Sequence, residues 1–147
     1  MKRPILLIIL VLIALCGCKH KTIDMTPLNE KLKIQKESLA MNKINCLKAI
    51  IGDSINNVNH VIFLYNGFDC ITCIDKGYEL AKKIDSIVQK QTVQIISTSA
   101  NIGADQLRNE YMHFVHNDEH DLIRRELKYL YTPVLLSFDS TNRIDAI

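Results

Sequence analysis

The segment HVIFLYNGFDCITC, residues 60–73, decides the expected fold of this 147-residue chain. Its first six residues form an unbroken β-prone block, which is typical of a strand buried on both faces of a sheet. A four-residue turn then leads directly to Cys70. From Cys73 to Val88 apolar residues recur at intervals of three and four, which predicts an amphipathic helix. The segment therefore predicts a strand, a tight turn and a helix that opens with a Cys-x-x-Cys pair.

This arrangement predicts different chemistry for the two cysteines. Cys70 stands where the unpaired N–H groups and positive dipole of a helix end favour a thiolate, which can lower a thiol pKa from about 8.5 toward 7 or below. Cys73 lies one turn further along the same helix face, and we expect it to be the less exposed of the two. Cys70 is thus the candidate nucleophile, and Cys73 the candidate thiol that resolves a mixed disulfide.

The rest of the chain alternates helical and β-prone patterns. One or two helices are expected between residues 27 and 51. Further strands are expected over residues 92–97, 111–115, 134–138 and 143–147. Helices are expected over 104–110 and 118–131, with one longer broken helix as the alternative. This order predicts one α/β domain over residues 26–147, in which a mixed central sheet is flanked by helices and residues 26–59 form an N-terminal helical extension.

The N-terminus is typical of an export signal. Lys2 and Arg3 precede an apolar run over residues 5–15, and small residues follow it. Eleven apolar residues are fewer than the roughly 20 that a membrane span needs. A signal that is removed is therefore favoured, with an uncleaved transmembrane anchor as the alternative.

The apolar run ends in Leu-Cys-Gly-Cys, which resembles the bacterial lipobox. Cys18 is the expected lipidation site because a small residue precedes it. Cys16 is the poorer candidate, since bulky Leu15 would stand where the peptidase requires a small side chain. We therefore expect a lipoprotein signal peptide over residues 1–17 and a lipidated tether over residues 18–25, which would anchor the domain to a membrane.

Composition restricts the remaining function classes. An apolar fraction of 48% is sufficient for a single core. Removal of Lys2 and Arg3 with the signal leaves 16 of the 18 basic side chains, equal to the 16 acidic ones. A neutral chain with no basic stripe and no Trp is not typical of nucleic-acid binding, so no nucleic-acid partner is expected.

Three cysteines are left for thiol chemistry once Cys16 and Cys18 are set aside. Cys46 lies within an apolar helical pattern and is expected to be a small buried hydrophobic residue. Cys70 and Cys73 are the one close pair, and outside the cytoplasm such a pair can persist as a disulfide.

The chain combines the Cys70-x-x-Cys73 unit, a strand after its helix and a Thr132-Pro133 step before a further strand. In this combination it resembles the thioredoxin-like family, in particular its membrane-anchored lipoproteins. The resemblance spans residues 61–147. It implies a thioredoxin-like fold and protein thiol–disulfide oxidoreductase activity without a cofactor. It also implies that Cys70 attacks, that Cys73 resolves, and that Thr132 and Pro133 form a substrate-facing loop with a cis bond. The sequence stops before the final helix of that fold, which we expect to be absent.

The chain departs from the family pattern near the cysteines. Phe68 and Asp69 stand where the family has Trp ahead of the first cysteine, and an Ile-Thr pair replaces the commoner Gly-Pro or Pro-Pro between the cysteines. Leu64 stands six residues before Cys70, where classical thioredoxins have a buried acid. These departures bear on turnover rate and redox potential more than on the fold.

The implied partners are client protein thiols or disulfides, with a membrane thiol reductase as one candidate electron donor. The direction of electron flow is open: the pair could reduce misoxidised proteins or cytochrome precursors, oxidise client thiols, or pass electrons to a peroxidase. Lys19 follows Cys18 in place of the aspartate that commonly retains lipoproteins in the inner membrane. The expected location is therefore the periplasmic side of the cell envelope, with the outer membrane favoured.

Two other interpretations of the cysteine pair are open. The pair could be a structural disulfide in a non-catalytic binding module, which the missing Trp and acid would fit. It could also be half of a zinc site, but zinc requires four ligands. His113, His116 and His120 would share one side only on a helix, and a strand is the preferred interpretation there. No metal site is therefore expected.

The lipobox assignment predicts unequal effects of two substitutions. Cys18→Ser should leave unprocessed precursor and abolish acyl labelling in cells, because the modified thiol is lost. Cys16→Ser is the matched control and should leave processing and labelling intact. Labelling that survives Cys18→Ser would contradict the assignment.

Overall fold

The computed structural model describes residues 26–39, 42–52, 60–128 and 130–147. The expected signal peptide, the tether and the lipidation site Cys18 lie outside the described residues. The unit that spans residues 32–147 contains the whole sheet. None of the helices in the described ranges combines the length and apolar composition that a bilayer crossing requires.

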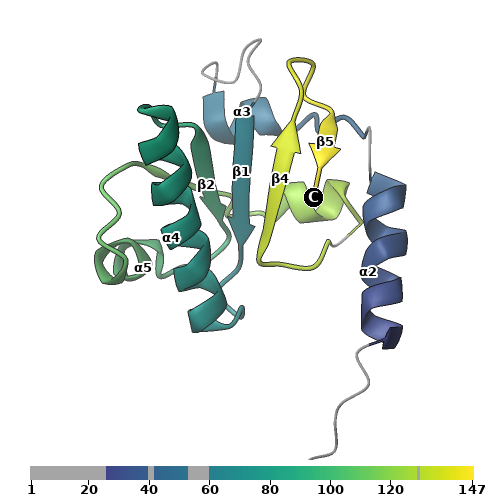
Figure 1. The fold of residues 1–147 in the computed structure, drawn as a ribbon, viewed down its shortest axis with the longest axis horizontal. Helices are drawn as coiled ribbons and strands as arrows, with labels where there is room; N and C mark the ends of the chain where they lie inside the picture. The colour runs from purple at the N-terminus through teal and green to yellow at the C-terminus, as the bar shows by residue number, and fades with distance from the viewer. Residues whose placement is uncertain (1–25, 40–41, 53–59, 129) are drawn as a thin grey trace, which may run out of the picture. The chain divides into compact units, whose positions relative to one another are not determined.

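Five strands form one mixed sheet in the order β3-β2-β1-β4-β5. Figure 1 shows β2, β1, β4 and β5 side by side in this order. The strands are β1 (His60–Tyr65), β2 (Val93–Ser97), β3 (Val115–Asn117), β4 (Val134–Phe138) and β5 (Ile144–Ala146). β1 runs parallel to β2 and antiparallel to β4, while β2 is parallel to β3 and β4 antiparallel to β5. The helices are α2 (Thr26–Leu39), α3 (Leu47–Ile51), α4 (Ile71–Val88), α5 (Ile102–Arg108) and α6 (Leu122–Glu126). The predicted α/β class, with a mixed central sheet and flanking helices, is confirmed.

The central strand β1 supplies both core layers. Its side chains alternate between the two faces of the sheet, as the pleat of a strand requires. Ile62 and Leu64 pack in one layer with residues of α3, α6 and β4. Phe63 and Tyr65 pack in the other layer with residues of α4 and β2. Burial on both faces explains why this strand is an unbroken apolar block in the sequence.

Most predicted elements are confirmed, and two are misplaced. A strand was expected over residues 111–115, but β3 begins only at Val115, where it pairs with Ile95. Tyr111 instead turns inward and packs edge-on against Tyr78, at a ring-centroid distance of 5.3 Å. Its neighbours Met112 and Phe114 are 91% and 70% exposed, so these two apolar side chains of the expected strand are not part of the core.

The helix expected over residues 118–131 is the second misplaced element, because α6 covers only Leu122–Glu126. Asp118 sets its start, since its carboxylate accepts hydrogen bonds from the backbone N–H groups of Leu122 and Ile123 at 2.8 and 2.9 Å. Lys128 has a left-handed backbone with φ of 54°, which is incompatible with helix continuation.

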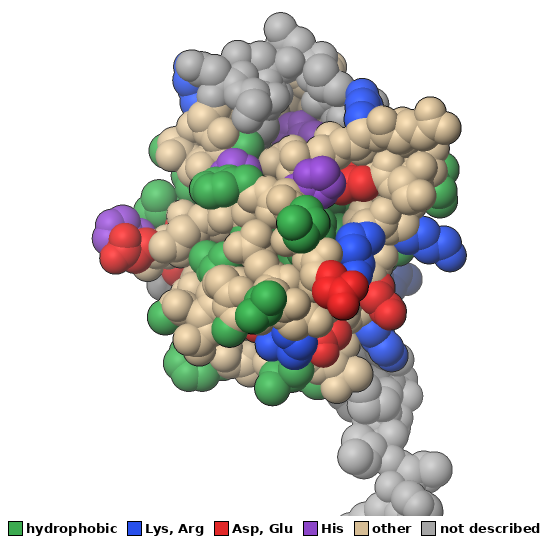
Figure 2. All heavy atoms as spheres, turned by 90° about the vertical axis from the view of Figure 1, so that its left-hand side faces the viewer, with side chains coloured by type: hydrophobic (Ala, Val, Ile, Leu, Met, Phe, Trp, Pro, Cys, Tyr) green, Lys and Arg blue, Asp and Glu red, His purple; other side chains and the backbone are tan. Residues whose placement is uncertain are grey.

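The side of the domain that carries α4 and α5 has a mixed surface. In the view onto this side, exposed apolar side chains are scattered among charged ones (Figure 2). Scattered apolar side chains are ordinary on soluble domains. The scattered apolar side chains on this face therefore do not indicate a docking surface.

The contact between α4 and β1 predicts a strong effect of one small substitution. A Cβ atom on Gly77 would overlap the ring of Phe63, whose side chain is only 2% exposed and has little room to move. Gly77→Ala should therefore lower the free energy of unfolding by about 1–3 kcal/mol or more. Urea denaturation measures this change.

Gly103 in α5 is the matched control, because a Cβ atom there meets nothing within 4 Å. Gly103→Ala should raise the free energy of unfolding by roughly 0.5–1 kcal/mol, since alanine loses less conformational freedom in a helix. Equal stability changes in the two variants would contradict the close packing of α4 on β1.

Candidate active site

Cys70 occupies the N-cap of the 18-residue helix α4, directly after the turn that leaves β1. Its carbonyl accepts the first hydrogen bonds of the helix, from the backbone N–H groups of Cys73 and Ile74, both at 2.9 Å. Both cysteines of the pair are free and exposed. The predicted unit of strand, turn and cysteine pair at a helix start is therefore confirmed.

The two thiols are electrostatically unequal. The Cys73 thiol donates a hydrogen bond to the Cys70 sulfur, and the backbone N–H groups of Cys73 and Thr72 also point to it, which together lower the pKa of Cys70. The same thiol–thiol hydrogen bond raises the pKa of Cys73, with further contributions from desolvation and from the charges of Cys70 and Asp69. Lys76 opposes this rise without reversing it. Because the pKa of Cys70 is lowered and that of Cys73 is raised, Cys70 is the thiol of the pair that loses its proton first.

The expectation that Cys73 is shielded is wrong. Cys73 is exposed like Cys70, because the buried stripe of α4 runs through Ile74, Gly77 and Tyr78 and leaves Cys73 beside it. The difference between the two thiols therefore comes from hydrogen bonding and charge rather than from access.

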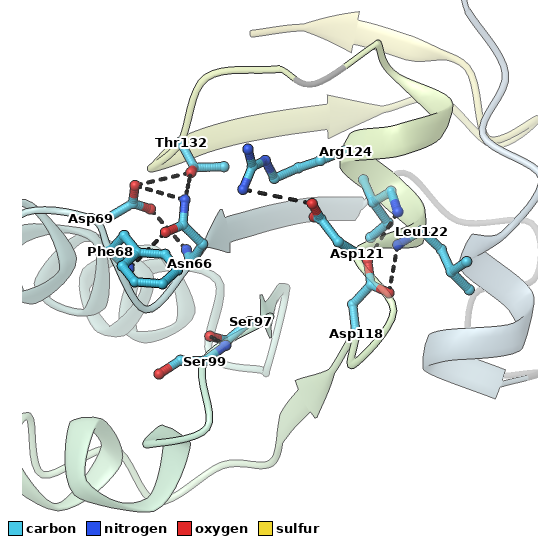
Figure 3. A network of polar contacts seen from close by, with 11 residues as sticks. Asn66, Phe68, Asp69, Ser97, Ser99, Asp118, Asp121, Leu122, Arg124 and Thr132 are labelled. Carbon is cyan, nitrogen blue, oxygen red and sulfur yellow. Dashed lines mark hydrogen bonds and ion pairs between the residues drawn. The ribbon is translucent and has the colours of Figure 1, made fainter.

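The Thr132-Pro133 loop lies against the turn that carries the cysteines (Figure 3). The Thr132–Pro133 bond is cis, as expected from the resemblance. The Thr132 hydroxyl donates a 3.0 Å hydrogen bond to Asp69 Oδ1, and it accepts a short one from the Asn66 amide. Asp69 immediately precedes Cys70, so the structure brings this loop to the cysteine pair. That Thr132 and Pro133 contact a substrate stays a prediction.

Asn66 and Asp69 are further candidate site residues, for which the sequence predicted only a turn. The Asn66 side chain accepts a hydrogen bond from the backbone N–H of Phe68 at 2.7 Å. Asp69 Oδ2 accepts one from the backbone N–H of Asn66 at 2.8 Å. An Asn at the first position of a turn and an Asp at the fourth, with such side chain-to-backbone bonds, is the signal that could have identified them.

Leu64 stands at the sequence position where classical thioredoxins have a buried acid, and its surroundings in the structure are apolar. Leu64 is buried in the core layer on the face of the sheet opposite α4. The face beneath α4 has polar groups instead: the hydroxyl of Tyr78 donates to that of Tyr65 at 2.9 Å, and Tyr65 donates to Asp105 Oδ2 at 3.2 Å. Burial raises the pKa of both phenols, which therefore stay protonated.

Cys46 is a half-buried, hydrogen-bonded thiol rather than the purely apolar residue that was expected. Glu126 accepts hydrogen bonds from the backbone N–H groups of Asn45 and Cys46, at 2.8 and 3.1 Å. Burial and a further hydrogen bond from its thiol to Glu126 raise the pKa of Cys46 to about 12. Cys46 is therefore almost entirely protonated at neutral pH and is a poor nucleophile there.

The three histidines weighed as metal ligands do not share a helix. His116 lies on β3 and shares a 3.1 Å hydrogen bond with Gln94, whereas His113 precedes that strand and His120 precedes α6. Within the described ranges, His, Cys, Asp and Glu side chains form no group of three or more that could hold a metal ion.

The sheet order, the parallel β1–α4–β2 connection and the cysteine pair at the start of α4 are arranged as the resemblance implied. The fold is thioredoxin-like. No protein-family model and no curated protein matches the chain.

Similar solved structures include two from Mycobacterium tuberculosis, a secreted disulfide oxidoreductase homologous to E. coli DsbE and the protein DsbF, and the thioredoxin domain of a Bacteroides vulgatus thiol–disulfide oxidoreductase. Their identities to this chain are 10%, 12% and 10%, each with a TM-score of 0.49. The similarity covers 63%, 65% and 64% of this chain and 70%, 73% and 71% of theirs.

The hydrogen bond between the two thiols predicts how Cys73 variants change Cys70. Cys73→Ala removes the S–H donor, so the pKa of Cys70 should rise toward the ordinary thiol range. Cys73→Ser keeps a hydroxyl donor and should hold the pKa of Cys70 low. The rate of alkylation by iodoacetamide, followed against pH in the reduced protein, measures this pKa.

The alkylation profile of Cys73→Ala should therefore shift to higher pH than that of Cys73→Ser. Cys46 stays protonated through the relevant range and adds little to the measured rate. Coincident profiles for the two variants would show that the side chain of Cys73 does not stabilise the Cys70 thiolate.

Proposed function

We propose that this chain is a lipid-anchored, extracytoplasmic protein thiol–disulfide oxidoreductase that uses Cys70 and Cys73 as its redox pair. One observation supports this most directly: an exposed Cys70 sulfur at the start of a long helix accepts hydrogen bonds from the thiol and backbone of the next turn. This arrangement favours the nucleophilic thiolate and keeps a protonated partner thiol in contact with it.

The chemistry needs only the two thiols and a client disulfide. The Cys70 thiolate attacks one client sulfur, the client S–S bond breaks, and the other client sulfur leaves as a thiolate. Cys73 then loses its proton and attacks the Cys70 sulfur of the mixed disulfide. The client sulfur that was bonded to Cys70 leaves as a thiolate, so the client gains two electrons and the chain holds a Cys70–Cys73 disulfide. The reverse sequence oxidises a client dithiol, and neither direction requires a cofactor.

The proposed setting is the cell envelope. Lipidation of Cys18 would tether a domain over residues 26–147 to the periplasmic side of a membrane, with Lys19 favouring the outer one. Client proteins would supply thiols or disulfides, and their extended segments would meet the Thr132-Pro133 loop. When the pair reduces clients, a membrane thiol reductase would restore it.

Trapping of mixed disulfides tests the proposed function. Cys73→Ser keeps the attacking thiolate but cannot resolve the intermediate, so it should accumulate adducts with a disulfide-containing peptide and with envelope proteins. These adducts should collapse on reduction. Cys70→Ser is the matched control and should trap far less, because Cys73 lies one turn inside α4, whereas the N-cap position of Cys70 is where the helix dipole best stabilises a thiolate.

The rival function is a non-catalytic binding module in which Cys70 and Cys73 form a structural disulfide. The absence of a Trp before Cys70 and the buried Leu64 in place of an acid favour it. It predicts that either serine variant lowers the stability of the oxidised protein to a similar extent, with no adducts. If the unmodified chain exchanges with no model disulfide and Cys73→Ser captures nothing, the enzyme proposal is wrong.

A further inference from the structure

Three side chains form a closed ring of hydrogen bonds beside the cysteine pair (Figure 3). Asn66 Nδ2 donates to Asp69 Oδ1 at 2.9 Å and also to the hydroxyl of Thr132. The Thr132 hydroxyl donates in turn to Asp69 Oδ1 at 3.0 Å. Two members, Asn66 and Asp69, belong to the turn between β1 and α4, and the third, Thr132, belongs to the loop before β4.

The ring uses the hydrogen-bonding capacity of its members almost completely. The hydroxyl of Thr132 has one proton, and Asp69 accepts it. The second oxygen of Asp69 accepts the backbone N–H of Asn66, and the side-chain oxygen of Asn66 accepts the backbone N–H of Phe68. Hydrogen bonds to a carboxylate are stronger than those between neutral groups. Asp69 therefore links the turn and the loop across 63 residues of sequence.

We propose that Asp69 is a positioning residue, which clamps the Thr132-Pro133 loop to the turn of Cys70 so that the loop is in place when a client polypeptide arrives. The inference rests on the proposed function, because it assumes that the loop receives the client. When the turn and the loop already have fixed positions, less conformational entropy is lost as the client binds and Cys70 attacks. The Thr132 hydroxyl is occupied by the clamp, so the client meets the backbone of the loop rather than this side chain.

The proposed clamp should affect one reaction of the Cys70 thiolate and not another. Reaction with a peptide disulfide requires the thiolate and also the Thr132-Pro133 loop in its correct position. Alkylation by the small reagent iodoacetamide requires only the thiolate. A residue that tunes the thiolate changes both rates. A residue that positions the loop changes the peptide rate alone.

Thr132→Val is the sharpest variant, because it removes the hydroxyl, keeps the side-chain shape and leaves the charge of Asp69 unchanged. Its rate of reaction with a single-disulfide peptide should fall about tenfold, as expected for a lost hydrogen bond to a charged group. Its iodoacetamide rate should stay at the wild-type value. A peptide rate equal to wild type, or an equal fall in both rates, would overturn the proposal.

A double-mutant cycle tests whether Asp69 acts through Thr132. Asp69→Ala should lower the peptide rate at least as much as Thr132→Val, and the double variant should be no slower than Asp69→Ala alone. Losses that multiply in the double variant would mean that the two residues act independently and would overturn the clamp. Glu79→Gln is the charge control: it removes a carboxylate from an exposed position of α4 and should change neither rate.

Failure of the clamp and failure of the proposed function are distinguishable. If the unmodified chain does not react with peptide disulfides, the function proposal fails, and the same cycle is measured by urea denaturation of the reduced protein. Non-additive unfolding free energies for Asp69→Ala and Thr132→Val would support the clamp, and additive ones would overturn it. If Asp69→Ala does not fold, Thr132→Val with its two rates decides the question.

Discussion

The position of strand β1 at the centre of the sheet is the constraint on which the rest of the structure depends. Its alternating side chains have to fill one core layer beneath α4 and another beneath α3 and α6. Since β1 has strands on both sides, its ends are held in register by β2 and β4. The turn that leaves it is therefore placed accurately, and so is the cysteine at the start of α4. The redox chemistry proposed for this chain follows from that placement.

The inequality of the two thiols depends on local hydrogen bonds at this helix start. Cys70 accepts from the thiol of Cys73 and from backbone N–H groups, which stabilises negative charge on its sulfur. Cys73 keeps its proton because it is the donor and because the charges of Cys70 and Asp69 oppose a second negative charge. Burial and the hydrogen bond to Glu126 raise the pKa of Cys46, so this thiol stays protonated and is a poor nucleophile. Only the pair at α4 is arranged for thiol exchange among the three cysteines of the described residues.

Sequence patterns predicted the parts of the fold that local rules control. The apolar block of β1, the periodicity of α4 and the cysteine pair at its start are visible in contiguous residues, and the structure confirms them. The start of α6 is set locally, by hydrogen bonds to the side chain of Asp118, but apolar periodicity does not show them. The inward turn of Tyr111 depends on Tyr78 of α4, so the start of β3 could not be found from its own segment. The ring joining Asp69 to a loop 63 residues away is likewise a tertiary contact without a sequence pattern of its own.

The reduction potential of the Cys70–Cys73 pair tests the central claim most directly. Equilibration of the protein with glutathione buffers of known ratio, followed by alkylation and mass measurement, gives its value. A redox-active pair should equilibrate reversibly, with a potential above about −300 mV, since structural disulfides generally lie below that value. A potential below it, or no reduction by glutathione while the protein stays folded, would contradict the account and identify a structural disulfide.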